Sequence, residues 1–245
     1  MQSAISDVKS QGLSKNLKGL ENSLPQASKT IMPKVVGAAL TETDNPKEVI
    51  EEIAKVDKKA ANNPLIFAQK YLGIDEKDPT QQATIKGFIN KAVPGFVKKA
   101  SEVSQDAKAW CAAFVNNVLN EGDFGGLDYE SDKYNLIRAR KYAKIGEEVP
   151  NISEGKPGDI MVVKDLTGTN GYHVAFYSGK KNGKHLMLGG NQDGRYVNVK
   201  EIDEDSLKIV SVRRLKNIED IDEDSLKLIT SSKHYSSTDK KSNLR

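Results

Sequence analysis

Hydrophobic positions change their spacing near residue 157, and the change divides the chain into a helical part and a part made of strands. Before residue 157, apolar residues recur three and four places apart, which is the spacing of one helix face. After it, short runs rich in Val, Ile and Tyr are separated by Gly, Asn and Asp, as in antiparallel strands. Helices followed by antiparallel strands predict an α+β domain, which we place at residues 62–216.

Capping residues and apolar stripes predict three helices before residue 95. One lies within TDNPKEVIEEIAKVDKKA and belongs to an N-terminal segment of helix and linker, residues 1–61. A second runs from residue 63 to 73 and a third from 78 to 93. Each of these two begins with a polar residue followed by Pro and is ended by Gly or Pro, the usual punctuation of helices.

Five strands are expected in the second part of the chain. They are GDIMVVK, GYHVAFYSGK, KHLMLGG, RYVNVKEI and LKIVSVRRL. Between the second and the third, Asn182-Gly183 is a strong signal for a two-residue hairpin turn, so these strands are predicted to pair antiparallel. The heptapeptide IDEDSLK occurs at 202–208 and again at 221–227. Residues 217–245 are polar and are expected to be an unfolded tail.

The stretch KAWCAAFVNNVLNEG predicts a fourth helix, which contains the only cysteine of the chain, Cys111, beside the only tryptophan, Trp110. Ser104 or Asp106 is the candidate cap. A thiol attacks as thiolate, and its pKa falls near a helix N-terminus and beside a histidine. We therefore expect alkylation of Cys111 to stay fast below the ~8.5 pKa of a free thiol if a histidine pairs with it. A cysteine among Ala, Phe and Val also fits a small buried hydrophobe.

Three histidines are available as a base for Cys111. His234 lies in the polar tail, and His185 lies at the turn end of the hairpin. His173 opens a strand at the other end, where it faces Gln192 in a regular hairpin. A bulge at Gly189-Gly190 would bring Asn191 opposite His173 instead. Both amides therefore remain candidates for the third residue that holds a catalytic imidazole.

Composition narrows the partners and the compartment. The net charge of +3 is small and its Lys residues are interleaved with acidic ones, so no nucleic-acid partner is predicted. A single cysteine excludes an intramolecular disulfide, and no spacing of ligands suggests a metal site. The polar N-terminus carries no signal peptide, and no window is apolar enough to span a membrane.

Four segments in one order, WCAAFVNNVL, KPGDIMVV, GYHVAFYSG and LGGNQ, resemble a phage-associated branch of the NlpC-type and CHAP superfamily of cysteine amidases and peptidases. AQKYLGIDE and IKGFINKAV also resemble the helical lead-in of that branch. The second asparagine of the first segment, Asn117, replaces an aromatic residue of many relatives, which bears on packing more than on chemistry. The resemblance covers residues 62–216.

The resemblance implies a papain-like fold, in which a helix bearing the cysteine packs on an antiparallel sheet, and cleavage of amide bonds in bacterial peptidoglycan. Carried over residue by residue, Cys111 is the nucleophile, His173 the base and acid, and Asn191 the orienting residue, with Gln192 in reserve. No cofactor or metal is implied. Trp110 and Tyr172 are candidates for the substrate groove, and Trp110 fits a core position equally well.

The resemblance also implies a setting. An N-acetylmuramoyl-L-alanine amidase and a peptidoglycan endopeptidase are both compatible with it. The protein would be made in the cytoplasm and reach the wall either through a holin or as part of a phage particle, where the N-terminal helices would bind other virion proteins. Two further hypotheses stay open: a Cys-His deamidase or acyltransferase toxin, and a virion structural or binding protein without turnover.

Overall fold

The computed structural model describes residues 62–104, 109–125, 127, 135–167, 171–221, 223–230 and 235–236. Residues 59–245 cluster into one compact unit. The helix predicted within TDNPKEVIEEIAKVDKKA, the candidate cap Asp106 and His234 lie outside the described residues. No described helix has the length and apolar character needed to cross a membrane.

Three predicted helices are present, and their termini follow the capping signals of the sequence in part. They are α4 (Pro64–Gln69), α5 (Gln82–Ala92) and α6 (Cys111–Glu121). The side chain of Asn63 caps α4 by accepting a hydrogen bond from the Leu65 N–H at 2.9 Å. The short 3₁₀ helices η1 (Ala100–Ser104), η2 (Asn135–Ile137) and η3 (Ala139–Lys144) complete the helical layer. A further one, η4 (Ile152–Glu154), packs through Ile152 against the other face of the sheet.

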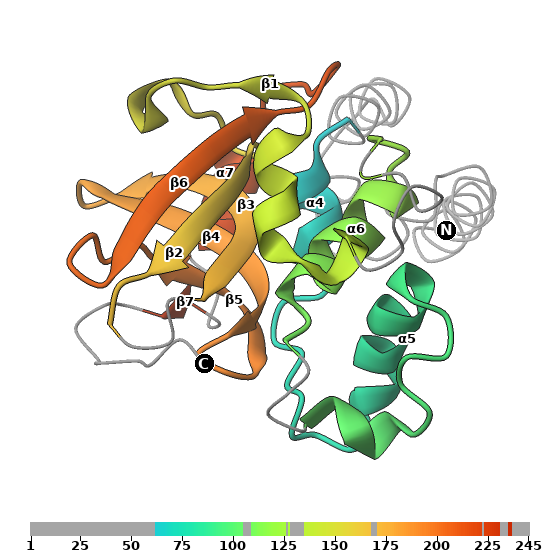
Figure 1. Ribbon diagram of the computed structural model, residues 1–245. Coiled ribbons are helices and arrows are strands. Elements are labelled where there is room, and N and C mark those ends of the chain that lie inside the picture. Colours follow the sequence, from blue (N-terminus) through green and yellow to red (C-terminus); the bar gives the residue numbers. More distant parts are fainter. Residues whose placement is uncertain are drawn as a thin grey trace, which may run out of the picture. The chain divides into compact units, whose positions relative to one another are not determined.

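All five predicted strands are confirmed, and they form one sheet. The described strands are β1 (Glu147–Glu148), β2 (Ile160–Asp165), β3 (Tyr172–Lys181), β4 (Lys184–Gln192), β5 (Tyr196–Glu201), β6 (Leu207–Arg214) and β7 (Tyr235–Ser236). Their order in the sheet is β1-β6-β2-β3-β4-β5-β7, and every pair is antiparallel except the short β5–β7 pair (Figure 1). The α+β class is therefore confirmed, with β1 and β7 added to the strands that the sequence predicts.

The hairpin between β3 and β4 has the predicted turn but a register shift at an unexpected place. Asn182 and Gly183 both have positive φ, at 51° and 81°, as the two-residue turn requires. Next to the turn, Lys181 pairs with Lys184 and Lys180 with His185, as a two-residue turn requires. Farther along β3, the two residues Ser178 and Gly179 oppose a single residue of β4, which shifts the pairing by one. The bulge in this pair of strands thus lies near the turn, and not at Gly189-Gly190, the place considered from the sequence.

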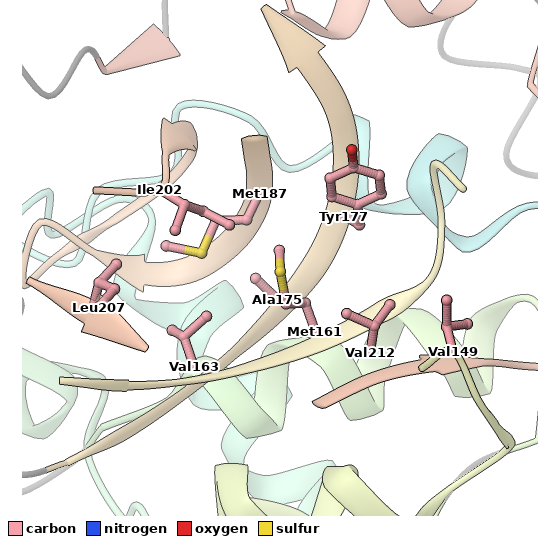
Figure 2. Close-up of a cluster of buried hydrophobic side chains, with 9 residues drawn as sticks. All are labelled: Val149, Met161, Val163, Ala175, Tyr177, Met187, Ile202, Leu207 and Val212. Atoms are coloured by element: carbon pink, nitrogen blue, oxygen red, sulfur yellow. The ribbon is translucent and has the colours of Figure 1, made fainter. Parts of the chain in front are cut away.

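Apolar side chains cover both faces of the sheet. On one face, α6 packs against β3 and β4 with Trp110, Phe114 and Val118 fully buried, as their helical spacing predicts. The other face carries the buried cluster drawn in Figure 2: Val149, Met161, Val163, Ala175, Tyr177, Met187, Ile202, Leu207 and Val212. Residues alternate between these faces along β3, so His173 lies on the face of Ala175 and Tyr177.

The expectation of an unfolded tail after residue 216 requires correction. Helix α7 (Glu223–Thr230) follows there, with Ile229 fully buried, and Leu226 reaches the β3 bulge at Gly179. The amide of Asn63 donates to the backbone oxygen of Glu219 at 2.8 Å, which attaches the segment before α7 to the start of α4. Apolar residues three places apart give this second IDEDSLK copy a helical face to bury.

Candidate active site

Cys111 is the first residue of α6, and Trp110 is its N-cap without a capping hydrogen bond from the side chain. The predicted cap Ser104 instead ends η1. The first amides of a helix have no partner inside the helix. Here the N–H groups of Cys111 and Ala112 are directed at the Cys111 sulfur. The sulfur therefore lies at the positive end of the helix.

The backbone of β3 brings a third amide to the same sulfur. Tyr177 N–H donates to the Asp159 carbonyl at 2.7 Å, on the side of β2. Amides alternate in direction along a strand, so the Val174 N–H points to the opposite side, toward β4. The pairing of β3 with β4 stops before Val174 is reached, and its N–H is directed at the Cys111 sulfur instead. The thiol thus lies where the two strands separate, at the peptide that joins His173 to Val174.

His173 and Gln192 lie beside the same glycine. A methyl group on Gly189 would be 3.1 Å from His173 Nε2 and 3.4 Å from Gln192 Cδ. His173 Nε2 and Gln192 Oε1 are both buried, and neither makes a well-formed hydrogen bond with the described residues. Gln192 nevertheless raises the pKa of His173, as an acceptor facing the ring does. Since neither atom has another partner in the described part of the chain and Gln192 acts on the ring, we interpret the two atoms as partners.

The residue beside His173 Nε2 is therefore Gln192, the reserve candidate, and not Asn191, for a physical reason. Asn191 has a φ of 58°, in the left-handed region that Asn tolerates. It lies where the pairing of β4 with β5 shifts by one, between Gly189 and Gln192. This bulge places the Gln192 side chain on the Gly189 face, where regular alternation would have placed Asn191.

Gln192 is held by a chain of polar side chains on β5 and the turn before it. Its Nε2 donates to both oxygens of Asn198, the carbonyl O at 2.6 Å and Oδ1 at 2.7 Å. Asn198 Nδ2 donates to Asp193 Oδ2 at 2.7 Å, and Lys200 Nζ donates to Asp193 Oδ1 at 2.7 Å. Asn198 and Lys200 are almost fully buried. Gln192 and Asn198 therefore connect the imidazole to the part-buried ion pair of Asp193 and Lys200.

Burial determines the protonation of the site. It lowers the pKa of His173 to about 4, with Lys200 acting in the same direction and Gln192 and Asp193 against it. Burial also raises the pKa of the Cys111 thiol, although the amides of Val174, Ala112 and Cys111 lower it. Of the two expected causes of a lowered thiol pKa, the amides at the helix N-terminus operate but are outweighed, and His173 is not among the groups that shift the pKa of Cys111. At neutral pH the site rests as a thiol and a neutral imidazole.

Trp110 and Tyr172, the two candidates for a substrate groove, lie in different environments. Trp110 is fully buried, donates through Nε1 to Glu76 Oε2 at 2.9 Å, and packs with Phe88 at 6.4 Å between ring centroids. It is therefore a core residue, and its assignment to a substrate groove is corrected. Tyr172 is half-buried, and the Arg140 guanidinium lies over its ring at 5.7 Å. Tyr172 stays a candidate for substrate contact.

Asp159, in the segment KPGDIMVV, and His185 both have structural partners. The fully buried Asp159 binds Arg214 through both carboxylate oxygens, at 2.9 and 2.7 Å, and its Oδ2 also accepts from the Lys156 N–H. His185 lies at the turn end, where its Nδ1 is 3.0 Å from the Tyr177 hydroxyl. Neither is placed at the sulfur.

Sequence reasoning missed Asn198, Asp193, Lys200 and Tyr142. In RYVNVKEI, Asn198 and Lys200 alternate with valines, a pattern that normally marks a solvent-facing side of a strand. Asp193-Gly194 signals only a turn. Tyr142 is fully buried on η3, and its hydroxyl lies 3.1 Å from the carbonyl oxygens of Ala112 and Leu136, which fixes the first turn of α6. No local pattern distinguishes these residues from ordinary surface or core.

Within the described residues, no three His, Cys, Asp or Glu side chains gather as a metal site requires. Comparison with known proteins adds no identity to the site: no family model, no curated protein and no solved structure matches the chain.

Proposed function

We propose that this protein is a papain-like thiol hydrolase that cleaves amide bonds of bacterial peptidoglycan. The observation that carries the proposal is the position of the Cys111 sulfur. It lies at a helix N-terminus and against the amide that follows His173, whose Nε2 faces Gln192. Nucleophile, base and orienting amide are the three parts that thiol catalysis needs. The orienting role passes from Asn191 to Gln192.

The resting protonation suggests how the reaction would begin. Neutral His173 accepts the proton of the Cys111 thiol as sulfur attacks the carbonyl carbon and the S–C bond forms. The Cys111 N–H, at the positive end of α6, is a donor for the oxyanion. The C–N bond then breaks, and the amine leaves with the proton from His173. Water, deprotonated by His173, hydrolyses the thioester, and the thiol and the neutral imidazole are restored.

Peptidoglycan as substrate is supported by the resemblance of the four segments around Cys111, His173 and Gln192 to cell-wall amidases and peptidases. The bond cut is either the lactyl amide of muramic acid or a bond in the stem peptide or cross-bridge. A phage lysis enzyme and a virion component are both consistent with this substrate. The N-terminal segment, residues 1–61, would contact other virion proteins in the second case.

Digestion of purified peptidoglycan tests the proposal. Wild type and Cys111→Ala are incubated with walls of several bacteria, and the released fragments are identified by mass spectrometry. Fragments released by the wild type alone establish the nucleophile, and their new ends distinguish an amidase from an endopeptidase. Equal thermal unfolding of the two proteins serves as the control for folding, since Ala suits the first turn of a helix.

Two results would contradict the proposal. Release that survives Cys111→Ala would remove the thiol from the chemistry. Walls that are bound equally by both proteins and never cut would indicate a binding protein of a virion, in which Cys111 is only a small residue of the core. Modification of another protein substrate, with walls left intact, would indicate a deamidase or acyltransferase.

A further inference from the structure

The hydrogen-bond chain behind Gln192 has a single permitted direction. Lys200 has only donors at its ammonium group, and the Asp193 carboxylate has only acceptors. Asn198 must therefore present its NH₂ group to Asp193 and its Oδ1 to Gln192. Gln192 in turn must donate through Nε2 to Asn198, and this leaves Oε1 as the group that faces His173.

An acceptor at Gln192 Oε1 selects one form of the neutral imidazole. His173 Nε2 must carry the hydrogen in order to donate to Oε1, so the lone pair is left on Nδ1. The buried Nε2 and Oε1 atoms, both without another partner among the described residues, fit this arrangement. The reverse tautomer would place a lone pair on Nε2 against the lone pairs of Oε1 and leave both unsatisfied in a buried site.

We propose that Asn198, Asp193 and Lys200 are positioning residues that, through Gln192, hold His173 as the tautomer with hydrogen on Nε2 and the basic lone pair on Nδ1. The proposal rests on the proposed function in that it assigns His173 the role of base. It also explains why residue 192 carries an amide. The group at this place must donate to the two oxygens of Asn198 and accept from His173, which a carboxylate cannot do.

The backbone at Asp193 allows the carboxylate of Asp193 and the amide of Asn198 to be exchanged. This exchange leaves the donor-to-acceptor direction of the hydrogen-bond chain unchanged. Asp193 has a φ of 51°, which Asn also tolerates. In the double variant Asp193→Asn, Asn198→Asp, the new amide at 193 accepts from Lys200 and donates to the new carboxylate at 198. That carboxylate accepts from Gln192 as Asn198 Oδ1 did. The net charge and the size of the side chains are conserved.

The tautomer of His173 is measured by ¹⁵N–¹H correlation spectra of protein labelled with ¹⁵N-histidine at pH 7, without substrate. The proteins are wild type, Asn198→Leu, Asp193→Asn and the double variant. Lys184→Gln is the matched control. It breaks an ion pair with Glu201, 3.2 Å long, that joins the same two strands outside the chain.

Wild type, the control and the double variant are expected to show the Nε2–H form alone. Asn198→Leu removes one acceptor of Gln192, and Asp193→Asn places two NH₂ groups against each other, so each single variant is expected to give a mixture of tautomers. In Asn198→Leu, kcat on peptidoglycan should fall about five- to tenfold with little change in KM, because one hydrogen bond of about 1 kcal/mol is lost. If Asn198→Leu does not fold, Asp193→Asn with its double variant is the deciding pair.

The proposal is overturned if Asn198→Leu keeps the Nε2–H form alone, or if the double variant gives the same mixture as Asp193→Asn. Because the spectra need no substrate, failure of the proposed function is a separate result. If the wild type cuts no wall but all proteins show the expected spectra, peptidoglycan hydrolysis is refuted and the hydrogen-bond chain to His173 is supported. If the wild type cuts walls but the variants have unaltered spectra, only the proposed role of the hydrogen-bond chain is refuted.

Discussion

Acidification should destabilise the folded domain through His173, and the size of the effect can be worked from its burial. The imidazole is held neutral in the folded protein, with a pKa of about 4, whereas its ordinary value is 6.5. Between pH 4 and pH 6.5 the imidazole therefore binds a proton in the unfolded chain but not in the folded one. The stabilisation is fully present above pH 6.5 and is lost as the pH falls toward 4.

The difference of about 2.5 pKa units corresponds to about 3 kcal/mol below pH 4. Between pH 7 and pH 5 the same titration removes about 2 kcal/mol. His173→Gln abolishes this contribution because glutamine does not titrate. The other acidic and basic groups are common to both proteins, so the comparison between them isolates the imidazole.

Urea unfolding at pH 7 and pH 5 measures the effect. Trp110 is the only tryptophan and is fully buried, so its fluorescence reports unfolding of the domain around the site. Wild type should lose about 2 kcal/mol more than His173→Gln over this interval. Parallel losses in the two proteins would mean that His173 titrates in the folded state as it does in water, and the burial argument would be refuted.

Three further outcomes are expected. Because burial raises the Cys111 pKa, iodoacetamide at pH 7 should modify the folded protein at least about ten times more slowly than the urea-unfolded chain. This is the reverse of the expectation from sequence, and equal rates would contradict it. Gly190→Ala should lower the free energy of unfolding by about 1–3 kcal/mol, because its methyl would overlap the side chains of Trp110 and Phe114. Gly87→Ala, with open space and a helical backbone, should be neutral or stabilising in the same urea titration. Arg214→Met should cost about 3–5 kcal/mol in thermal or urea unfolding by leaving the buried Asp159 unpaired, and activity per folded molecule should persist; a stable variant would show that water or another cation replaces the guanidinium.

The sequence places the thiol, the histidine and the amides on the correct elements because these signals are local. Cys111 was expected at a helix start, His173 at the opening of a strand and the amides at the end of the next strand, and the structure has each of them there. The choice between Asn191 and Gln192 could not be made locally. It depends on two bulges, one at Ser178 and Gly179 and one at Asn191, and a shift by one residue moves a side chain to the other face.

The polar residues behind Gln192 illustrate a second limit of local patterns. Valines alternating with Asn198 and Lys200 normally mean a strand with one face in water. In the folded chain that face is enclosed, and the polar side chains satisfy one another. The role of Asn198 and Lys200 depends on the residues that face them across the sheet. Only the pairing of β4 with β5 establishes which residues these are.

The two copies of IDEDSLK separate the features that local sequence specifies from those that packing decides. Five strands, three helices and the Asn182-Gly183 turn follow from periodicity and punctuation, because those preferences act within a few residues. The same seven letters, however, lead into strand β6 at 202–208 and enter helix α7 at 221–227. Neighbouring apolar residues and the surface available to bury them decide between the two, since packing outweighs propensities of a few tenths of a kcal/mol per residue.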